Sequence, residues 1–261
     1  MGRIEAPEAD ELVRFAGAMA DAAGALARRY FRSDIAVETK ADASPVTIAD
    51  REIERTLRDM IAARFPDHGI FGEEHGAASL DRDFVWVIDP IDGTKSFIAG
   101  MPLFGTLIAL LRDGQPVLGV VDHPALGERW VGAAGQATLR HGTPCRTRDC
   151  RALSDAILFA TSPDLFTGAD LDAFERVSRR ARMRRFGGDC YAYALLASGF
   201  VDAVVETGLQ PYDYLALVPV IEGAGGVITD WRGQRLGLAS DGRVVAAATP
   251  ALHEAITAML A

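Results

Sequence analysis

The residues whose chemistry is easiest to interpret are carboxylates at the end of a strand-like run. The run FVWVID (84–89) ends on Asp89, and Asp92 follows three residues later. Pro90 has no N–H to donate and should stop the strand there, while Gly93 permits a tight turn. Two carboxylates at such a corner can converge on one point, where they repel each other unless a cation lies between them.

Further acidic segments accompany this corner. Glu73 and Glu74 lie in a loop bounded by glycines, Asp213 lies just before an apolar helical stretch, and Asp50 lies near the start of another. Ligands that are all oxygen favour a hard cation, Mg²⁺ or Mn²⁺, over zinc. Several such segments suggest a site with more than one metal, which can clamp the attacking and leaving oxygens of a phosphoryl transfer.

Each acidic residue also has a structural explanation. Asp50 and Asp213 taken alone are typical helix N-caps. Asp92 before a glycine is typical of a turn, and the pair at 73–74 is typical of a solvated loop. Local sequence therefore indicates a divalent-metal site and names no substrate.

The composition is that of an acidic globular protein. A length of 261 residues suffices for one large unit or two tightly joined subdomains, and 49% hydrophobic residues argue against disorder. A formal net charge of −9 does not suit nucleic-acid binding and repels phosphate esters, so a phosphate substrate would need a local cation. The three cysteines form no C-x-x-C pair, and the sequence shows neither a membrane-length apolar run nor a signal-peptide pattern, so we expect a cytoplasmic protein.

Periodicity predicts the elements that must position these residues. Helices over about 8–30 and 47–64 should cover an antiparallel meander, whose strand-like runs are 84–89, 104–111, 116–122 and 128–133. Beyond about residue 151, strand-like runs at 156–161, 202–207 and 244–249 alternate with helical stretches near 170–181, 190–199 and 213–224 and at the end of the chain. This alternation indicates an α/β layer and subdomains at 1–150 and 151–261.

The ordered set of acidic motifs resembles the signature series of the inositol-monophosphatase superfamily. The motifs are GEE at 72–74, WVIDPIDGT at 86–94, and YD at 212–213 with a following EGAGG at 222–226. Their order and intervals match from about residue 35 to 235, and DPIDGT is highly specific. The resemblance implies an α/β protein, an alternating α/β/α/β/α sandwich, that hydrolyses a phosphate monoester with Mg²⁺.

The resemblance also implies metal ligands. It suggests two or three Mg²⁺ ions per site, with Mn²⁺ as a substitute. Glu73, Asp89 and the Ile91 carbonyl would hold the first ion. Asp89, Asp92 and Asp213 would hold the second.

Catalytic and phosphate-binding residues follow from the same motifs. Glu73 and Thr94 would orient the attacking water, and Asp50 would accept a hydrogen bond from the Thr94 hydroxyl. The backbone N–H groups of Gly93 and Thr94 would cradle the phosphate, and Asp213 would also face the substrate. These roles agree with the chemistry, because metals activate water and backbone donors hold an anion.

Finer motifs narrow the resemblance to the histidinol-phosphate phosphatases. They are DPIDGTKSFI at 89–98, PLFGTLIAL at 102–110, GGDCYAY at 187–193 and PYDY at 211–214. Asp189 stands where inositol monophosphatases usually carry a small uncharged residue, and Glu206 matches a substrate-contacting glutamate. Both are therefore predicted to bind substrate, although Asp189 alone is also a typical N-cap. Tyr212 replaces a tryptophan of many relatives, which keeps an aromatic wall and can alter the substrate side.

Three functions remain open on the sequence. The leading interpretation is hydrolysis of L-histidinol phosphate to L-histidinol in histidine biosynthesis. The alternatives are an inositol-1-monophosphatase of broad specificity and a regulatory RNA-polymerase-associated binding protein. The complete acidic set favours an enzyme, because a binding module does not need it. The resemblance further suggests a homodimer with a small-molecule substrate and no nucleic-acid or membrane partner.

A basic run stands apart from these motifs. Five arginines lie close together between residues 179 and 185. We interpret them as a solvated helix face.

Overall fold

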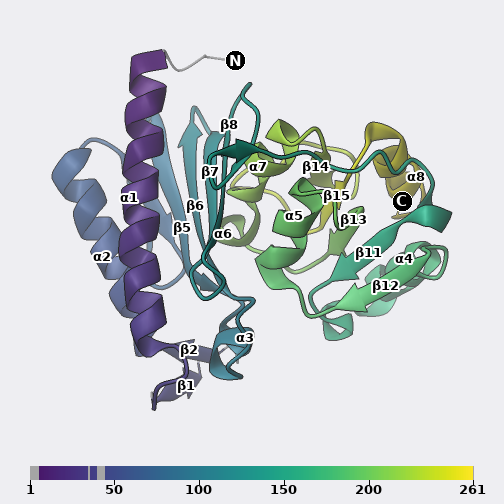
Figure 1. Cartoon of the computed structure of the whole chain (residues 1–261), viewed down its shortest axis with the longest axis horizontal. Coiled ribbons are helices and arrows are strands. Elements are labelled where there is room, and N and C mark those ends of the chain that lie inside the picture. Colours follow the sequence, from purple (N-terminus) through teal and green to yellow (C-terminus); the bar gives the residue numbers. More distant parts are fainter. Residues whose placement is uncertain (1–5, 35, 40–44, 261) are drawn as a thin grey trace.

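Five layers of helix and sheet, in the order α/β/α/β/α, make up the chain (Figure 1). They are seen in a computed structural model that describes residues 6–34, 36–39 and 45–260. The sandwich implied by the family resemblance is confirmed. Helix α1 (Ala6–Tyr30) lies in the first layer and α8 (Pro250–Leu260) in the last, so the two ends of the chain lie on opposite sides of the stack.

The two opening helices cover one face of a large sheet, as predicted. Helix α2 (Ile48–Arg64) begins after Thr47, whose side chain accepts a hydrogen bond from the Ala49 N–H. Apolar residues of α1 and α2 pack on Trp86 and on neighbouring strand residues to form the first core. In spatial order the strands are β10 (Thr143–Pro144), β9 (Leu139–Arg140), β8 (Glu128–Ala133), β7 (Gln115–His123), β6 (Gly105–Arg112), β5 (Phe84–Asp92), β3 (Gly69–Gly72) and β4 (Gly76–Ala78).

Strand β5 carries Asp89 and is longer than predicted. It pairs antiparallel with β6 and parallel with β3. The prediction that Pro90 ends the strand is wrong, because the register shifts between Asp89 and Asp92, and this irregularity accommodates a residue with no N–H. The Pro90 carbonyl accepts a hydrogen bond from Thr106 Oγ1 at 2.8 Å. Helix α3 (Thr94–Ile98) follows directly and lies against β2 (Pro45–Thr47), which pairs with β1 (Val37–Thr39).

Three helices fill the layer between the sheets. They are α5 (Asp189–Ala197), α6 (Pro211–Tyr214) and α7 (Leu217–Gly223). The single helix predicted over 213–224 is wrong, because the chain breaks into α6 and α7. Pro219 has no N–H to pair with the Leu215 carbonyl in a continuous helix, but it is tolerated in the first turn of α7.

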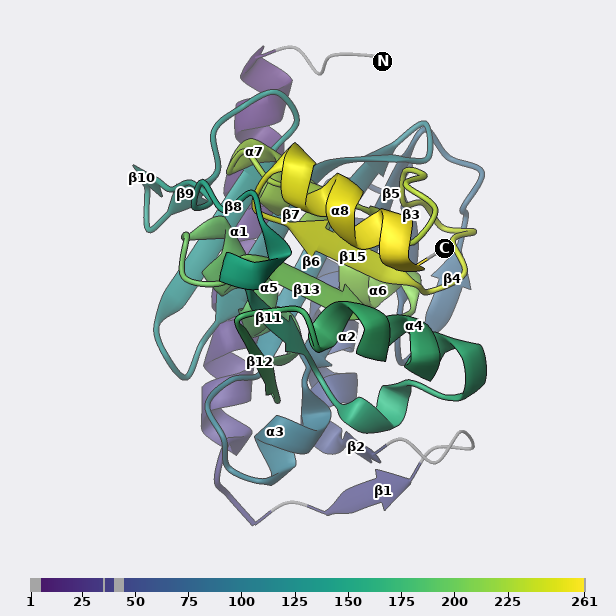
Figure 2. The same cartoon turned by 90° about the vertical axis from the view of Figure 1, so that its right-hand side faces the viewer.

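A smaller sheet completes the sandwich. Its spatial order is β12 (Met183–Phe186), β11 (Ile157–Ala160), β13 (Ala203–Glu206), β15 (Val244–Ala247) and β14 (Val227–Asp230). Helix α4 (Gly168–Ser178) and α8 cover its outer face (Figure 2). The helix interpretation of the arginine run is wrong, because α4 ends at Ser178 and residues 183–186 form an edge strand. Short 3₁₀ turns lie at Leu153–Asp155 and Pro163–Leu165.

The chain passes from the large sheet to the small one between β10 and β11. The boundary that we propose near residue 150 falls in this stretch. Helices from the second half pack on the first sheet, since α7 contacts β7 and β8. The two halves therefore share a core, and the candidate site draws residues from both.

Candidate active site

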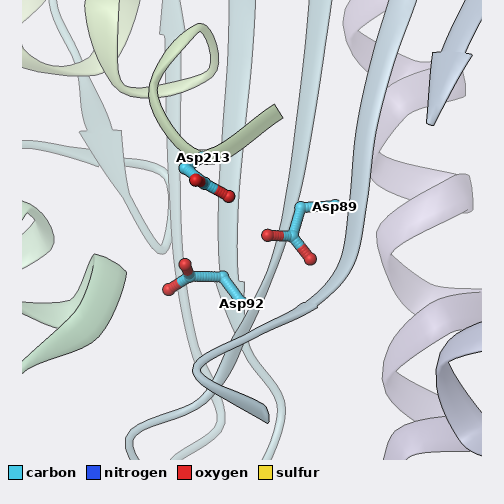
Figure 3. Close-up of side chains that lie close together, drawn as sticks. All are labelled: Asp89, Asp92 and Asp213. Carbon is cyan, nitrogen blue, oxygen red and sulfur yellow. The ribbon is translucent and has the colours of Figure 1, made fainter. Parts of the chain in front are cut away.

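Three aspartates from two elements converge at one end of the large sheet. Asp89 and Asp92 come from the irregular end of β5, and Asp213 comes from α6 (Figure 3). One carboxylate oxygen from each lies within 4.8 Å of the other two. The structure thus brings together residues from both halves of the chain.

Backbone N–H groups hold each of these carboxylates in place. Asp89 Oδ1 accepts from the Ile91 N–H at 3.0 Å, which fixes it within its own strand. Asp92 Oδ2 accepts from the Cys190 N–H at 2.7 Å, at the start of α5. Asp213 Oδ2 accepts from the Gln210 N–H at 2.7 Å. The carboxylates are therefore oriented before any ligand arrives.

Crowding and burial make these acids hard to ionise. Burial raises the pKa of Asp89 and Asp92 well above the ordinary range, and neighbouring carboxylates raise it further. Loss of hydration raises the pKa of Asp213 to about 7, although the Gln210 N–H opposes the shift. A cation among the three would favour their charged forms.

Glu73 joins this group electrostatically. It follows β3, and its backbone N–H donates to the Ile88 carbonyl at 3.3 Å. The negative charge of Glu73 raises the pKa of Asp89, Asp213 and Asp50. It is thus a direct neighbour of the three aspartates, and a side-chain hydrogen bond links it to Asp89.

Asp50 and Thr94 do not make the hydrogen bond that was predicted. Asp50 Oδ2 accepts from the backbone N–H of Thr47 at 2.8 Å and from its hydroxyl at 2.6 Å, because Asp50 closes the cap of α2. The Thr94 hydroxyl instead donates to the Ile91 carbonyl at 3.1 Å. Asp50 Oδ1 is buried and has no hydrogen-bond partner within the described part of the chain.

Asp189 lies directly beside the turn predicted to cradle phosphate. Gly93 has φ +79°, and a Cβ there would lie 2.8 Å from Asp189 Oδ2, so glycine provides both the turn and the close approach. The Ser96 hydroxyl donates to the same oxygen at 2.6 Å. Asp189 opens α5 with φ +44° and makes no side-chain cap, so the N-cap explanation is wrong.

Glu206 is buried and hydrogen-bonded through both carboxylate oxygens. It is 2% exposed. Its Oε1 accepts from the Thr161 N–H at 2.6 Å, and its Oε2 accepts from the Tyr193 hydroxyl at 2.8 Å. Both oxygens thus hold β11 and α5 in place, and each can accept a further hydrogen bond. Direct contact between Glu206 and the substrate stays a prediction.

Several known proteins are similar to this chain in fold and in sequence. The model of the "Inositol monophosphatase family" matches residues 8–261. The chain belongs to the inositol monophosphatase family. The Arabidopsis thaliana protein named "Bifunctional phosphatase IMPL2, chloroplastic" is 51% identical over 94% of this chain and 74% of its own length. A histidinol-phosphatase from Chlorobaculum parvum is 37% identical, covering 87% of this chain and 89% of its own. The solved structure of an inositol monophosphatase from Zymomonas mobilis has a TM-score of 0.89 and 44% identity, with 98% of this chain and 99% of that one aligned.

This inositol-monophosphatase-family chain is therefore a phosphatase, and its family depends on metal ions, typically Mg²⁺. The residues present fit such ions. The donor set is all oxygen, which suits a hard divalent cation. The buried, unpartnered Asp50 Oδ1 also suits a hydrated ion, whose water could satisfy it.

Sequence reasoning missed several residues that support the phosphatase site. Ser96 holds Asp189 across 93 positions of sequence, and the Cys190 N–H holds Asp92 across 98. Tyr193 holds Glu206. No local pattern links such partners, although the GGDCYAY motif contains two of them.

No helix in the described ranges has both the length and the hydropathy to cross a membrane.

Proposed function

We propose that this phosphatase hydrolyses L-histidinol phosphate to L-histidinol and phosphate, with Asp189 binding the cationic amine of the substrate. The position of Asp189 carries the proposal, because its carboxylate lies over Gly93 and is held there by Ser96. Beyond its phosphate, an inositol phosphate offers only hydroxyls, whereas histidinol phosphate offers an ammonium group and an imidazole. Burial raises the pKa of Asp189, so a cationic partner would stabilise its charged form.

The metal site is proposed as implied by the family. Bound divalent cations neutralise phosphate charge and lower the pKa of a coordinated water. Two or three Mg²⁺ ions, which Mn²⁺ can replace, would be held by Glu73, Asp89, the Ile91 carbonyl, Asp92 and Asp213. The backbone anchors of the aspartates support this assignment because they orient the carboxylates in advance.

The remaining residues act on the phosphate and the water. The N–H groups of Gly93 and Thr94 begin α3 and are proposed to bind the phosphate oxygens. Glu73 and the Thr94 hydroxyl are proposed to orient the attacking water. Asp50 Oδ1, which lacks a partner in the described part of the chain, is the acceptor available to a hydroxyl or water that enters the site.

Substrate comparison tests the proposal. Phosphate release should be measured in Mg²⁺ with histidinol phosphate, inositol 1-phosphate and 4-nitrophenyl phosphate. The wild type should have its highest kcat/KM with histidinol phosphate. Asp189→Asn should raise KM for histidinol phosphate about ten-fold or more, since a charge-assisted hydrogen bond is lost, and should leave the aryl phosphate nearly unaffected.

A matched control removes one charge elsewhere. Asp172 is exposed on α4, so Asp172→Asn should behave as the wild type with all three substrates. Equal losses on histidinol phosphate and the aryl phosphate, with a lower melting temperature, would mark Asp189 as structural and reopen the substrate assignment.

A broad inositol-1-monophosphatase is the second candidate. The 44% identity to the Zymomonas mobilis inositol monophosphatase favours it. A wild-type kcat/KM for inositol 1-phosphate that equals or exceeds that for histidinol phosphate would select this candidate. We also propose a homodimer, which gel filtration with light scattering tests, and a cytoplasmic location, which cell fractionation tests.

A further inference from the structure

Helix α2 carries a buried carboxylate that has no role in the site described above. Glu54 is 0% exposed and lies one helical turn after Asp50, on the same face of α2. Its Oε2 accepts from the Glu74 N–H at 2.6 Å, and its Oε1 accepts from the His75 N–H at 3.1 Å. Two backbone N–H groups of the turn that follows Glu73 thus donate hydrogen bonds to one side chain.

The fit of Glu54 against this turn is tight. A Cβ on Gly72 would lie 2.1 Å from Glu54 Oε1 and 2.4 Å from its Cδ, so the carboxylate occupies the space that a side chain at position 72 would need. Gly72 has no left-handed backbone. A glycine is therefore needed at position 72 because it has no side chain, which lets the Glu54 carboxylate approach the backbone.

Arg58 completes the contact one turn further along α2. Its Nε donates to Glu54 Oε1 at 2.7 Å, which pairs the buried charge. Its Nη2 donates to the Gly76 carbonyl at the other end of the turn. Glu54 and Arg58 together hold residues 72–76 on both sides, and we call this set the α2 clamp.

We propose that Glu54 is a positioning residue that sets metal affinity by fixing the turn that carries Glu73. The inference rests on the proposed role of Glu73 as a metal ligand. Glu73 is the proposed side-chain ligand that lies on a loop between two short strands, β3 and β4, so its position depends on how that loop is held. The α2 clamp holds the loop from both sides. Partners that orient metal ligands typically change metal affinity ~10–100-fold.

The chemistry of the clamp requires a carboxylate. Three hydrogen-bond donors meet at Glu54, namely two backbone N–H groups and one guanidinium, and His75 Nδ1 lies 3.4 Å from its Oε1. A glutamine has one acceptor oxygen, and its NH₂ would face a donor, so Glu54→Gln must leave at least one buried donor without an acceptor. The turn should then loosen although the side chain keeps its size.

Two measurements on Glu54→Gln test the proposal. In the metal-free protein, amide hydrogen exchange should become faster at residues 72–76 and remain as in the wild type across the large sheet. Mn²⁺ binding, followed by electron paramagnetic resonance, should weaken by about ten-fold or more. Glu52→Gln is the control, because Glu52 lies on the same helix and bonds Tyr30 instead of the turn.

A second variant guards against a folding defect in the first. Arg58→Lys keeps a cation beside Glu54 but loses the fork that also reaches the Gly76 carbonyl. It should give faster exchange confined to residues 72–76 and a smaller loss of Mn²⁺ affinity. Glu54→Gln with a lower melting temperature but unchanged Mn²⁺ affinity would overturn the positioning role.

The exchange experiment separates this inference from the proposed function. If the wild type binds Mn²⁺ but does not hydrolyse histidinol phosphate, the substrate proposal fails and the clamp stands. If exchange at residues 72–76 is unchanged in Glu54→Gln and Arg58→Lys, the clamp itself is wrong, whatever the substrate.

Discussion

Asp89 shows how one side chain can serve a metal site at a cost to the metal-free protein. It is 2% exposed and surrounded by the negative charges of Glu73, Asp92 and Asp213. The Ile91 N–H offsets only part of this repulsion. Such a residue is destabilising without a cation and is well placed to bind one.

Asp89→Asn should therefore separate activity from stability. Hydrolysis in Mg²⁺ should be nearly abolished, because the site loses a charge that both proposed ions share. In a chelator at neutral pH the variant should melt at a higher temperature than the wild type, since the amide still accepts from the Ile91 N–H and is neutral without having to take up a proton on folding. Phosphate release and thermal unfolding measure the two effects. Near-normal activity of Asp89→Asn would contradict the metal assignment.

Thr94 offers a second test at a single side chain. Its hydroxyl donates to the Ile91 carbonyl, which leaves the lone pairs of the oxygen able to accept from the attacking water. Thr94→Val keeps the shape and should lower kcat by ~10²–10⁴-fold, while inhibition by inorganic phosphate persists through the backbone N–H groups. Thr94→Ser should restore most of the rate. An unchanged kcat in Thr94→Val would leave Glu73 as the activating residue.

The placement of α6 and α7 depends on two glycines of the large sheet, where no side chain separates the helices from the strands. Gly119 on β7 and Gly132 on β8 are paired directly opposite one another. A Cβ on Gly119 would lie 2.0 Å from the Ala216 carbonyl oxygen, and one on Gly132 would lie 2.4 Å from the Pro219 carbonyl oxygen. The backbone around the α6–α7 break thus rests on the two glycines, and Asp213 reaches β5 from there.

Gly119→Ala and Gly17→Ala should have opposite effects on stability. Alanine at 119 meets backbone, which cannot yield without moving α7, so a loss of about 1–3 kcal/mol is expected. Alanine at 17 meets nothing within 4 Å in the middle of α1, so a gain of about 0.5–1 kcal/mol is expected. Denaturant unfolding measures both. If the two variants have the same free energy of unfolding, this account of the packing is wrong.

The stacking of five layers buries the charged site between subdomains and so couples stability to pH. Asp213 has a pKa of about 7 in the folded protein and an ordinary value of 3.8 when unfolded. Between these values the folded state holds a proton that the unfolded state has lost. The contribution of Asp213 to the free energy of unfolding is therefore present below about pH 4 and lost as the pH rises through about 7.

Metal binding should reverse this loss. The increase in melting temperature caused by Mg²⁺ should be larger at about pH 8 than at about pH 5, because the carboxylates must be deprotonated to bind. Thermal unfolding with Mg²⁺ and with a chelator measures it. Asp213→Asn should weaken the pH dependence. His123, whose pKa burial lowers to about 4, acts in the opposite sense in both proteins. The wild-type-minus-variant difference therefore removes its contribution and measures Asp213 together with its effect on the pKa of Asp89 and Asp92. An equal Mg²⁺ effect at both pH values would contradict the prediction.

Periodicity and turn chemistry were enough to predict much of the fold. The opening helices, the antiparallel meander and the alternating second half depend on patterns within about ten residues, and the structure has them. The predictions that failed were local rules overridden by packing. Pro90 lies inside a strand because an irregular register accommodates it, and residues 183–186 form a strand because they pair with β11 at an edge.

The residues of the candidate site also fall into two groups, those that the sequence predicted and those that only the packing of the layers brings together. Residue types and motif order pointed to Asp89, Asp92 and Asp213, because chemistry restricts which side chains can surround a cation. The partners of these residues followed no such rule. Ser96 beneath Asp189 and Glu54 behind Glu73 are chosen by contacts between distant segments, and only the packed layers bring those segments together. A single sequence records the identity of each partner but not the distance between them, because that distance depends on how every layer packs on the next.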